Sequence, residues 1–216
     1  TMKHTLAILF LLLFAGAAQA QTNSKYVQIM EKSLAGMDTL KTTEEWQARS
    51  NAFERIAQKE NKEWLPPYYV ALCQAMIFNF EKDATKQEAL TNKAEQFIAK
   101  ADSLMPNNSE VYVVKSMVTG MRIRLNPMVN GQKYGMMAGM YLEKAKSLDP
   151  TNPRAYTQEG ITTYFTPAQW GGSKEKGKEL LKTADEKYEA FKPASTIAPS
   201  WGKVMNDYIL EMVEKG

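Results

Sequence analysis

The sequence predicts an all-α fold in which about four helical hairpins stack into a solenoid and a last helix caps the C-terminal end. The first reason is a repeated segment: residues 98–106 and 142–150 share a pattern of small and apolar positions, end in proline and lie 44 residues apart. The same offset relates Tyr68, Tyr112 and Tyr156. A repeat of this length is typical of stacked helical hairpins, because one hairpin cannot bury its apolar face alone.

Apolar residues at three- and four-residue intervals are the second reason. They predict paired helices over residues 24–38 with 43–61, 66–80 with 86–104, 109–125 with 134–148, and 153–165 with 173–190, then a capping helix over 199–213. Thr42 or Thr43, Asn108 and Asn152 are expected as N-caps, and Pro153 suits the first turn that follows. A turn is predicted over residues 126–131, where Asn, Pro and Gly cluster.

Residues 2–20 are expected to be a secretory signal peptide. Lys3 and His4 precede a short apolar run, and a small-residue cleavage site ends at Ala20. The apolar run is too short to span a bilayer comfortably. We therefore expect residues 21–216 to form a single helical-repeat domain that is exported to the periplasm and has no membrane span.

The composition argues against several functional classes. His4 is the only histidine and Cys73 the only cysteine, so the exported domain has no histidine for a catalytic base or a zinc site. The net charge of +3 is dispersed along the chain, which argues against nucleic-acid binding. The carboxylate pairs lie in lysine-rich polar surroundings. We therefore expect no enzymatic activity, no catalytic residue, no metal and no cofactor.

The repeats resemble the tetratricopeptide family, in which small, bulky and small residues and then a proline follow one another along the second helix of each hairpin. This order is found at Ala94, Ile98, Ala101 and Pro106, again at Ala138, Leu142, Ala145 and Pro150, and without the proline at Gly177, Leu181 and Ala184. The resemblance covers residues 41–190 and implies a right-handed solenoid. Since the family repeat is about 34 residues, each unit here has extra residues, either between its two helices or as longer helices.

The resemblance implies that ligands lie on the concave face formed by the first helices of the hairpins. The corresponding positions are apolar and rich in methionine: Tyr69, Cys73, Met76, Val113, Met117, Met121, Ile161 and Tyr164. Such a row suits an apolar peptide, an amphipathic helix or an apolar small ligand, because thioethers adapt to different partners. The alternative is that these side chains pack against neighbouring helices.

Three arginines and one tryptophan complete the candidate site. Arg122, Arg124 and Arg154 could meet an acidic ligand group with a planar fork of donors, or they could pair with glutamates of a neighbouring repeat. Trp170 is either an exposed anchor on a loop rim or a side chain that fills a gap between helices.

Methionines are numerous, and Met136, Met137 and Met140 are close in sequence. They could form a soft site for Cu(I), but filling gaps beside Gly135 and Gly139 is the favoured interpretation.

The sequence thus favours a binding protein of the cell envelope that holds a peptide or protein partner. One alternative is an apolar small ligand that is handed to a transport component. Another is self-assembly through the open ends of the stack. No feature of the sequence fixes the oligomeric state.

Overall fold

The structure is a computed structural model that describes residues 24–215, so the predicted signal peptide and its cleavage site lie outside the described residues. Residues 24–215 contain helices and no strand, which confirms the all-α prediction. No helix among them is long and apolar enough to cross a membrane.

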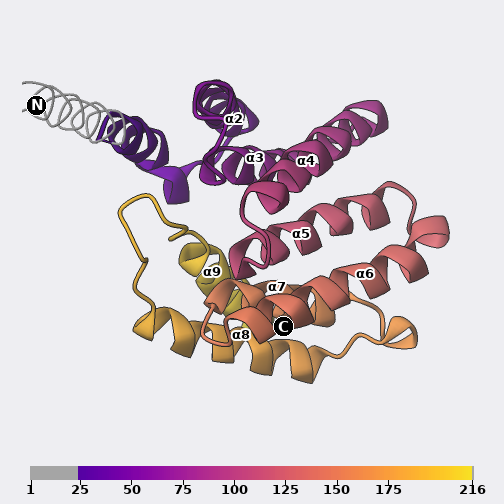
Figure 1. The fold of residues 1–216 in the computed structure, drawn as a ribbon. Coiled ribbons are helices and arrows are strands. Elements are labelled where there is room, and N and C mark those ends of the chain that lie inside the picture. The colour runs from indigo at the N-terminus through magenta and orange to yellow at the C-terminus, as the bar shows by residue number, and fades with distance from the viewer. Residues whose placement is uncertain (1–23, 216) are drawn as a thin grey trace, which may run out of the picture.

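The helices follow the predicted pairing (Figure 1). In chain order they are a helix over residues 24–34, η1 (Met37–Thr39), α2 (Thr43–Lys59), α3 (Leu65–Phe80), α4 (Ala84–Leu104), α5 (Ser109–Leu125), α6 (Pro127–Leu148), α7 (Pro153–Phe165), η2 (Ala168–Trp170), α8 (Lys174–Ala190) and α9 (Lys203–Lys215). The pairs α3–α4, α5–α6 and α7–α8 form hairpins two, three and four. Their first helices α3, α5 and α7 contact one another in series, which is consistent with a solenoid.

The helix starts show how local chemistry sets the boundaries. Thr42 and Glu45 form a reciprocal capping box at α2, and Asn108 and Asn152 cap α5 and α7 as predicted. Asn126 is also a cap, because its side chain accepts the N–H of Val129. Helix α6 therefore begins at Pro127, and the predicted turn over residues 126–131 is wrong. An Asn-Pro pair signals a turn, but it is equally an N-cap followed by the first helical residue.

The extra length of each repeat lies in the second helices. Helices α4 and α6 have 21 and 22 residues, whereas α3 and α5 have 16 and 17. The connections α3–α4 and α5–α6 are short, at residues 81–83 and 126. Of hairpins two to four, hairpin four has the long connection, over residues 166–173.

Small residues act differently in two of the hairpins. A Cβ added to Gly177 in α8 would lie 2.8 Å from the backbone N and Cα of Tyr164, so α7 and α8 approach closely there. In α6 a Cβ at Gly139 would meet nothing within 4 Å, and the same holds for Gly135. Met136 and Met140 are 63% and 70% exposed, so the gap-filling interpretation is wrong for them. The buried side of α6 carries Ala138, Leu142 and Ala145.

Two ion pairs join successive hairpins at equivalent positions with opposite polarity. Lys115 in α5 lies 2.8 Å from Asp102 in α4, and Lys146 in α6 lies 2.7 Å from Glu159 in α7. Asp102 and Lys146 occupy the same place in their repeats, 44 residues apart, as do Lys115 and Glu159. The boundaries on the two sides of hairpin three are therefore each bridged by an ion pair, but with the signs exchanged.

The stack has two different edges (Figure 1). Helices α3, α5 and α7 begin at one edge, which we call the N-terminal edge. They end at the opposite edge, which we call the turn edge, where the chain reverses into α4, α6 and α8. Residues 191–202, which we call the strap, leave α8 and return along the N-terminal edge before α9 begins.

Candidate functional site

Five of the predicted concave-face residues are part of the core. Tyr69, Cys73, Val113, Met121 and Arg154 are each at most 2% exposed. Met76, Met117, Ile161 and Tyr164 are partly buried, whereas Arg124 and Trp170 are exposed. An open groove along the whole predicted row is therefore absent from the described residues, and the packing alternative accounts for the five buried side chains.

The strap covers the first of these residues. The hydroxyl of Tyr69 donates to the backbone oxygen of Ile197 at 3.4 Å, and the indole N–H of Trp201 donates to the hydroxyl of Tyr68 at 2.8 Å. Ile197 and Trp201 are buried. The strap has no helical periodicity, and it returns from more than 120 residues further along the chain. Helical periodicity in the sequence therefore does not predict that the strap covers Tyr69.

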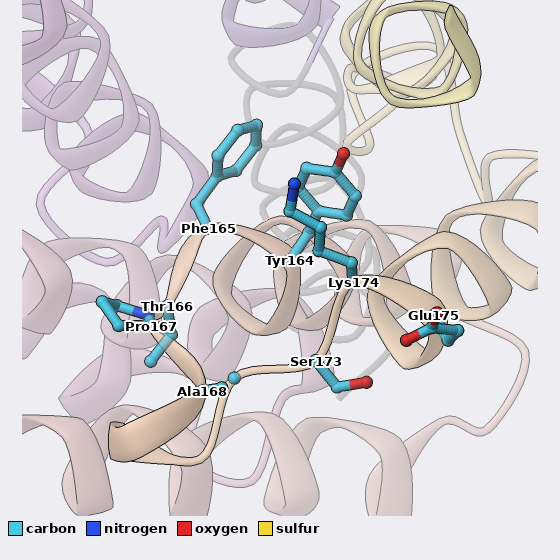
Figure 2. A pocket seen from close by; sticks show the side chains of 9 residues that line it. Tyr164, Phe165, Thr166, Pro167, Ala168, Ser173, Lys174 and Glu175 are labelled. Carbon is cyan, nitrogen blue, oxygen red and sulfur yellow. The ribbon is translucent and has the colours of Figure 1, made fainter. Parts of the chain in front are cut away.

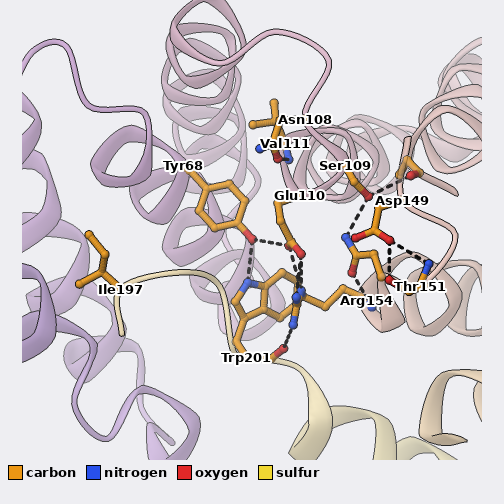
Figure 3. Close-up of polar contacts among 12 residues, drawn as sticks. Tyr68, Asn108, Ser109, Glu110, Val111, Asp149, Thr151, Arg154, Ile197 and Trp201 are labelled. Carbon is orange, nitrogen blue, oxygen red and sulfur yellow. Dashed lines mark hydrogen bonds and ion pairs between the residues drawn. The ribbon is translucent and has the colours of Figure 1, made fainter. Parts of the chain in front are cut away.

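A buried polar cluster, which we call the staple, joins hairpins two, three and four to the strap (Figure 3). Arg154 donates from Nε and Nη2 to the carboxylate of Glu110 at 2.6–3.0 Å, and from Nη1 to the backbone oxygen of Trp201 at 3.1 Å. Tyr68 donates to the same carboxylate at 3.2 Å. Burial disfavours the charge of Arg154, but Glu110 outweighs it, so the pKa of the guanidinium is raised.

The three predicted arginines are thus in different situations. Arg154 is enclosed by the staple, and Arg122 donates to both oxygens of Glu95 at 2.6 and 2.7 Å. Arg124 stacks on the ring of Phe78 at 4.7 Å and donates to Asn79. Among the described residues, Arg124 has no carboxylate within ion-pair distance. It is the one of the three that remains available to an acidic group.

A pocket of about 710 Å³ opens at the turn edge of hairpin four (Figure 2). We call it the turn pocket. It is lined by the end of α7, the connection and the start of α8, through Tyr164, Phe165, Thr166, Pro167, Ala168, Gly172, Ser173, Lys174 and Glu175. Ser173 caps α8 by accepting the N–H of Lys176. The backbone N–H of Ser173 also donates to Thr163 at 2.9 Å, which fixes the connection against α7.

The turn pocket combines aromatic surface with one cation. The rings of Tyr164 and Phe165 pack edge to face with centroids 5.0 Å apart, and Phe165 is 53% exposed. Lys174 Nζ lies 5.7 Å from the Tyr164 ring centre. Trp170, in the same connection, is 61% exposed, which fits the exposed-anchor alternative and not the gap-filling one. This arrangement can hold a planar apolar ligand that carries an acidic group.

A second groove of about 520 Å³ lies between α4, α5 and α6. Tyr112, Tyr134 and Tyr141 line it together with Lys115. Lys115 Nζ lies 4.7 Å from the ring centres of both Tyr112 and Tyr141. None of the predicted site residues lines this groove. Tyr112 and Tyr141 both follow the 44-residue repeat, but the repeat does not indicate that they line one groove with Tyr134.

Metal-binding groups are not gathered anywhere in the described part of the chain. Residues 24–215 contain no group of three His, Cys, Asp or Glu side chains placed to hold a metal ion. Cys73 is fully buried, and burial raises the pKa of its thiol, so it is poorly suited as a thiolate ligand.

Fold and site together define an all-α protein of helical hairpins with an aromatic surface pocket at one turn. Among solved structures, the chain is similar to the HusA haemophore from Porphyromonas gingivalis, with 30% identity and a TM-score of 0.77. The match covers 88% of this chain and 93% of HusA. The chain therefore belongs to the family of the HusA haemophore. No protein-family model and no curated protein matches it, so the tetratricopeptide assignment is not confirmed.

Proposed function

We propose that this protein binds haem or a closely related porphyrin at the turn pocket. The observation that carries the proposal is the family relationship to a protein described as a haemophore, which extends over nearly the whole of both chains. The proposal corresponds to the apolar small-ligand alternative from the sequence, but at a different place from the predicted concave row.

The turn pocket has the chemistry that a porphyrin needs. Its volume of about 710 Å³ lies within the range of about 300–1,000 Å³ that is usual for ligand sites. Tyr164, Phe165 and Pro167 offer apolar surface to the macrocycle. The ammonium group of Lys174 and the hydroxyl of Ser173 can donate to its carboxylates.

Histidine ligation of iron is not part of the proposal, because residues 24–215 contain no histidine. Binding would depend on ring contacts, apolar contacts and charge. We propose a carrier rather than an enzyme, since the relative is described as a haemophore. We also propose that it works outside the cytoplasm, as the signal-like residues 2–20 suggest.

A peptide partner is the second candidate, and the groove between α4, α5 and α6 favours it. Its three tyrosines, with Lys115 and Glu95, offer both apolar surface and hydrogen-bonding groups along neighbouring helices. Tyr134→Ala would weaken a partner held there and would leave haem binding at the turn pocket unchanged.

Titration with haem, followed by absorbance, tests the proposal. Phe165→Ala should weaken binding about tenfold, because it removes an aromatic wall. Phe80→Ala is the matched control, since Phe80 is 49% exposed at the end of another first helix. Lys174→Gln should weaken binding about threefold, as an exposed ion pair would. The proposal fails if wild type shows no saturable binding, or if Phe80→Ala weakens it as much as Phe165→Ala.

A further inference from the structure

Exposed apolar side chains gather at the turn edge. Five large ones lie at or just after the ends of three successive first helices, with exposures of 49%, 84%, 73%, 53% and 61% for Phe80, Met128, Val129, Phe165 and Trp170. Since the hairpins stack in parallel, these turns lie along the same edge (Figure 1). Large apolar groups repeated along one edge are typical of an interaction surface.

Positive charge accompanies these residues. The segments 80–86, 124–133 and 165–176 carry six basic side chains and three acidic ones. The basic ones are Lys82, Lys86, Arg124, Lys133, Lys174 and Lys176. Two of the acids, Glu81 and Asp83, accept backbone N–H groups at the start of α4. The turn edge therefore offers an excess of cations, one of which, Arg124, has no described carboxylate partner.

The arrangement of the exposed side chains at the turn edge limits the kind of partner that can bind there. Met128 and Val129 lie in the first turn of α6, and Trp170 lies in the connection of hairpin four, outside the lining of the turn pocket. These side chains project from separate turns and do not line one continuous groove. A deformable surface can receive such separate projections, and tryptophan is favoured where one side is apolar and the other is wet.

We propose that the turn edge docks on an anionic lipid surface. Trp170, Met128 and Val129 enter the headgroup region, and the surrounding lysines and Arg124 meet lipid phosphates. This docking is peripheral, and it does not depend on haem binding.

Co-sedimentation with vesicles tests the docking. The protein should sediment with vesicles of phosphatidylcholine and phosphatidylglycerol, less with phosphatidylcholine alone, and less as salt is raised. The triple variant Met128→Ser, Val129→Ser, Trp170→Ser should lower the bound fraction about tenfold. Circular dichroism should show unchanged helicity, because all three residues are exposed.

A matched triple variant supplies the control. Met105→Ser, Val204→Ser and Tyr208→Ser change residues that are 42%, 58% and 66% exposed but lie away from the turn edge. This variant should bind vesicles like wild type. Absence of sedimentation, or an equal loss in both triple variants, would overturn the proposal. Self-association of wild type that is lost in the first variant, without vesicle binding, would also overturn it and show an interface between copies.

Discussion

The two edges of the stack are formed by the same helices, but the side chains at one edge are buried and those at the other are exposed. At the N-terminal edge Arg154, Tyr68 and Trp201 are buried and joined to one another or to Glu110 by hydrogen bonds. At the turn edge, Phe165 and Trp170 are exposed, and Arg124 has no carboxylate of the described residues within ion-pair distance. The difference indicates that one edge holds the hairpins together and leaves the other free to contact ligands and surfaces.

The largest expected effect comes from breaking the staple. Arg154→Met leaves the carboxylate of Glu110 largely buried without its cation, so the free energy of unfolding should fall by about 3–5 kcal/mol in urea denaturation. Adding Glu110→Gln should recover part of the loss, because the uncompensated charge is then removed. A loss below about 1 kcal/mol in the single variant would show that the staple is not what secures this edge.

Two glycines with positive φ, one at each edge, allow the two edges to be compared directly. Gly202 in the strap has φ 109°, and a Cβ there would lie 2.2 Å from the Tyr188 hydroxyl oxygen. Gly171 in the connection of hairpin four has φ 89° and open space around the same position. Gly202→Ala should therefore cost about 3 kcal/mol and Gly171→Ala about 1 kcal/mol in thermal or chemical unfolding. Equal costs would mean that crowding at the strap is unimportant.

Alkaline pH should weaken the N-terminal edge first. Burial raises the pKa of Tyr188 from 10.0 to about 12. The folded state therefore keeps this proton between about pH 10 and 12 while the unfolded chain loses it, so stability is full below pH 10 and declines as pH rises. The decline due to Tyr188 is about 2 kcal/mol.

Tyr188→Phe isolates that contribution. The Tyr188 hydroxyl is buried and makes no hydrogen bond within the described residues, and the nearby Thr157 hydroxyl donates to Asn206. The variant should match wild type in stability at pH 7 and lose less between pH 10 and 12. Unfolding midpoints across this pH range would measure both, and parallel curves for the two proteins would exclude Tyr188 as the source.

The smallest effect on stability is expected at the turn edge. Trp170→Ser should change the free energy of unfolding by less than about 0.5 kcal/mol, because an exposed side chain has little packing to lose. Differential scanning calorimetry would check this, and a clear loss of stability would show that Trp170 packs more tightly than its exposure indicates.

The fold could be predicted further than the site. Periodicity and capping residues such as Asn108 and Asn152 report on local contacts, so the helices were found to within a few residues except at Asn126. The concave row rests on the tetratricopeptide resemblance, which says nothing of the strap. Within that row the strap covers Tyr69, and the contact between Tyr69 and Ile197 joins residues 128 positions apart that no periodic pattern connects. The sequence predicts Tyr164 and Trp170 as site residues, but not their neighbour Phe165.

The exchanged ion pairs have a consequence for how the chain can vary. Hairpin three presents Lys115 to its predecessor and Lys146 to its successor, so a duplicated copy of it stacked on the original would set two ammonium groups against each other. Hairpin three therefore fits only between neighbours that supply an acid on each side. Lengthening the array by simple duplication of this hairpin is disfavoured. The charges at the boundaries therefore restrict the order in which the hairpins can follow one another.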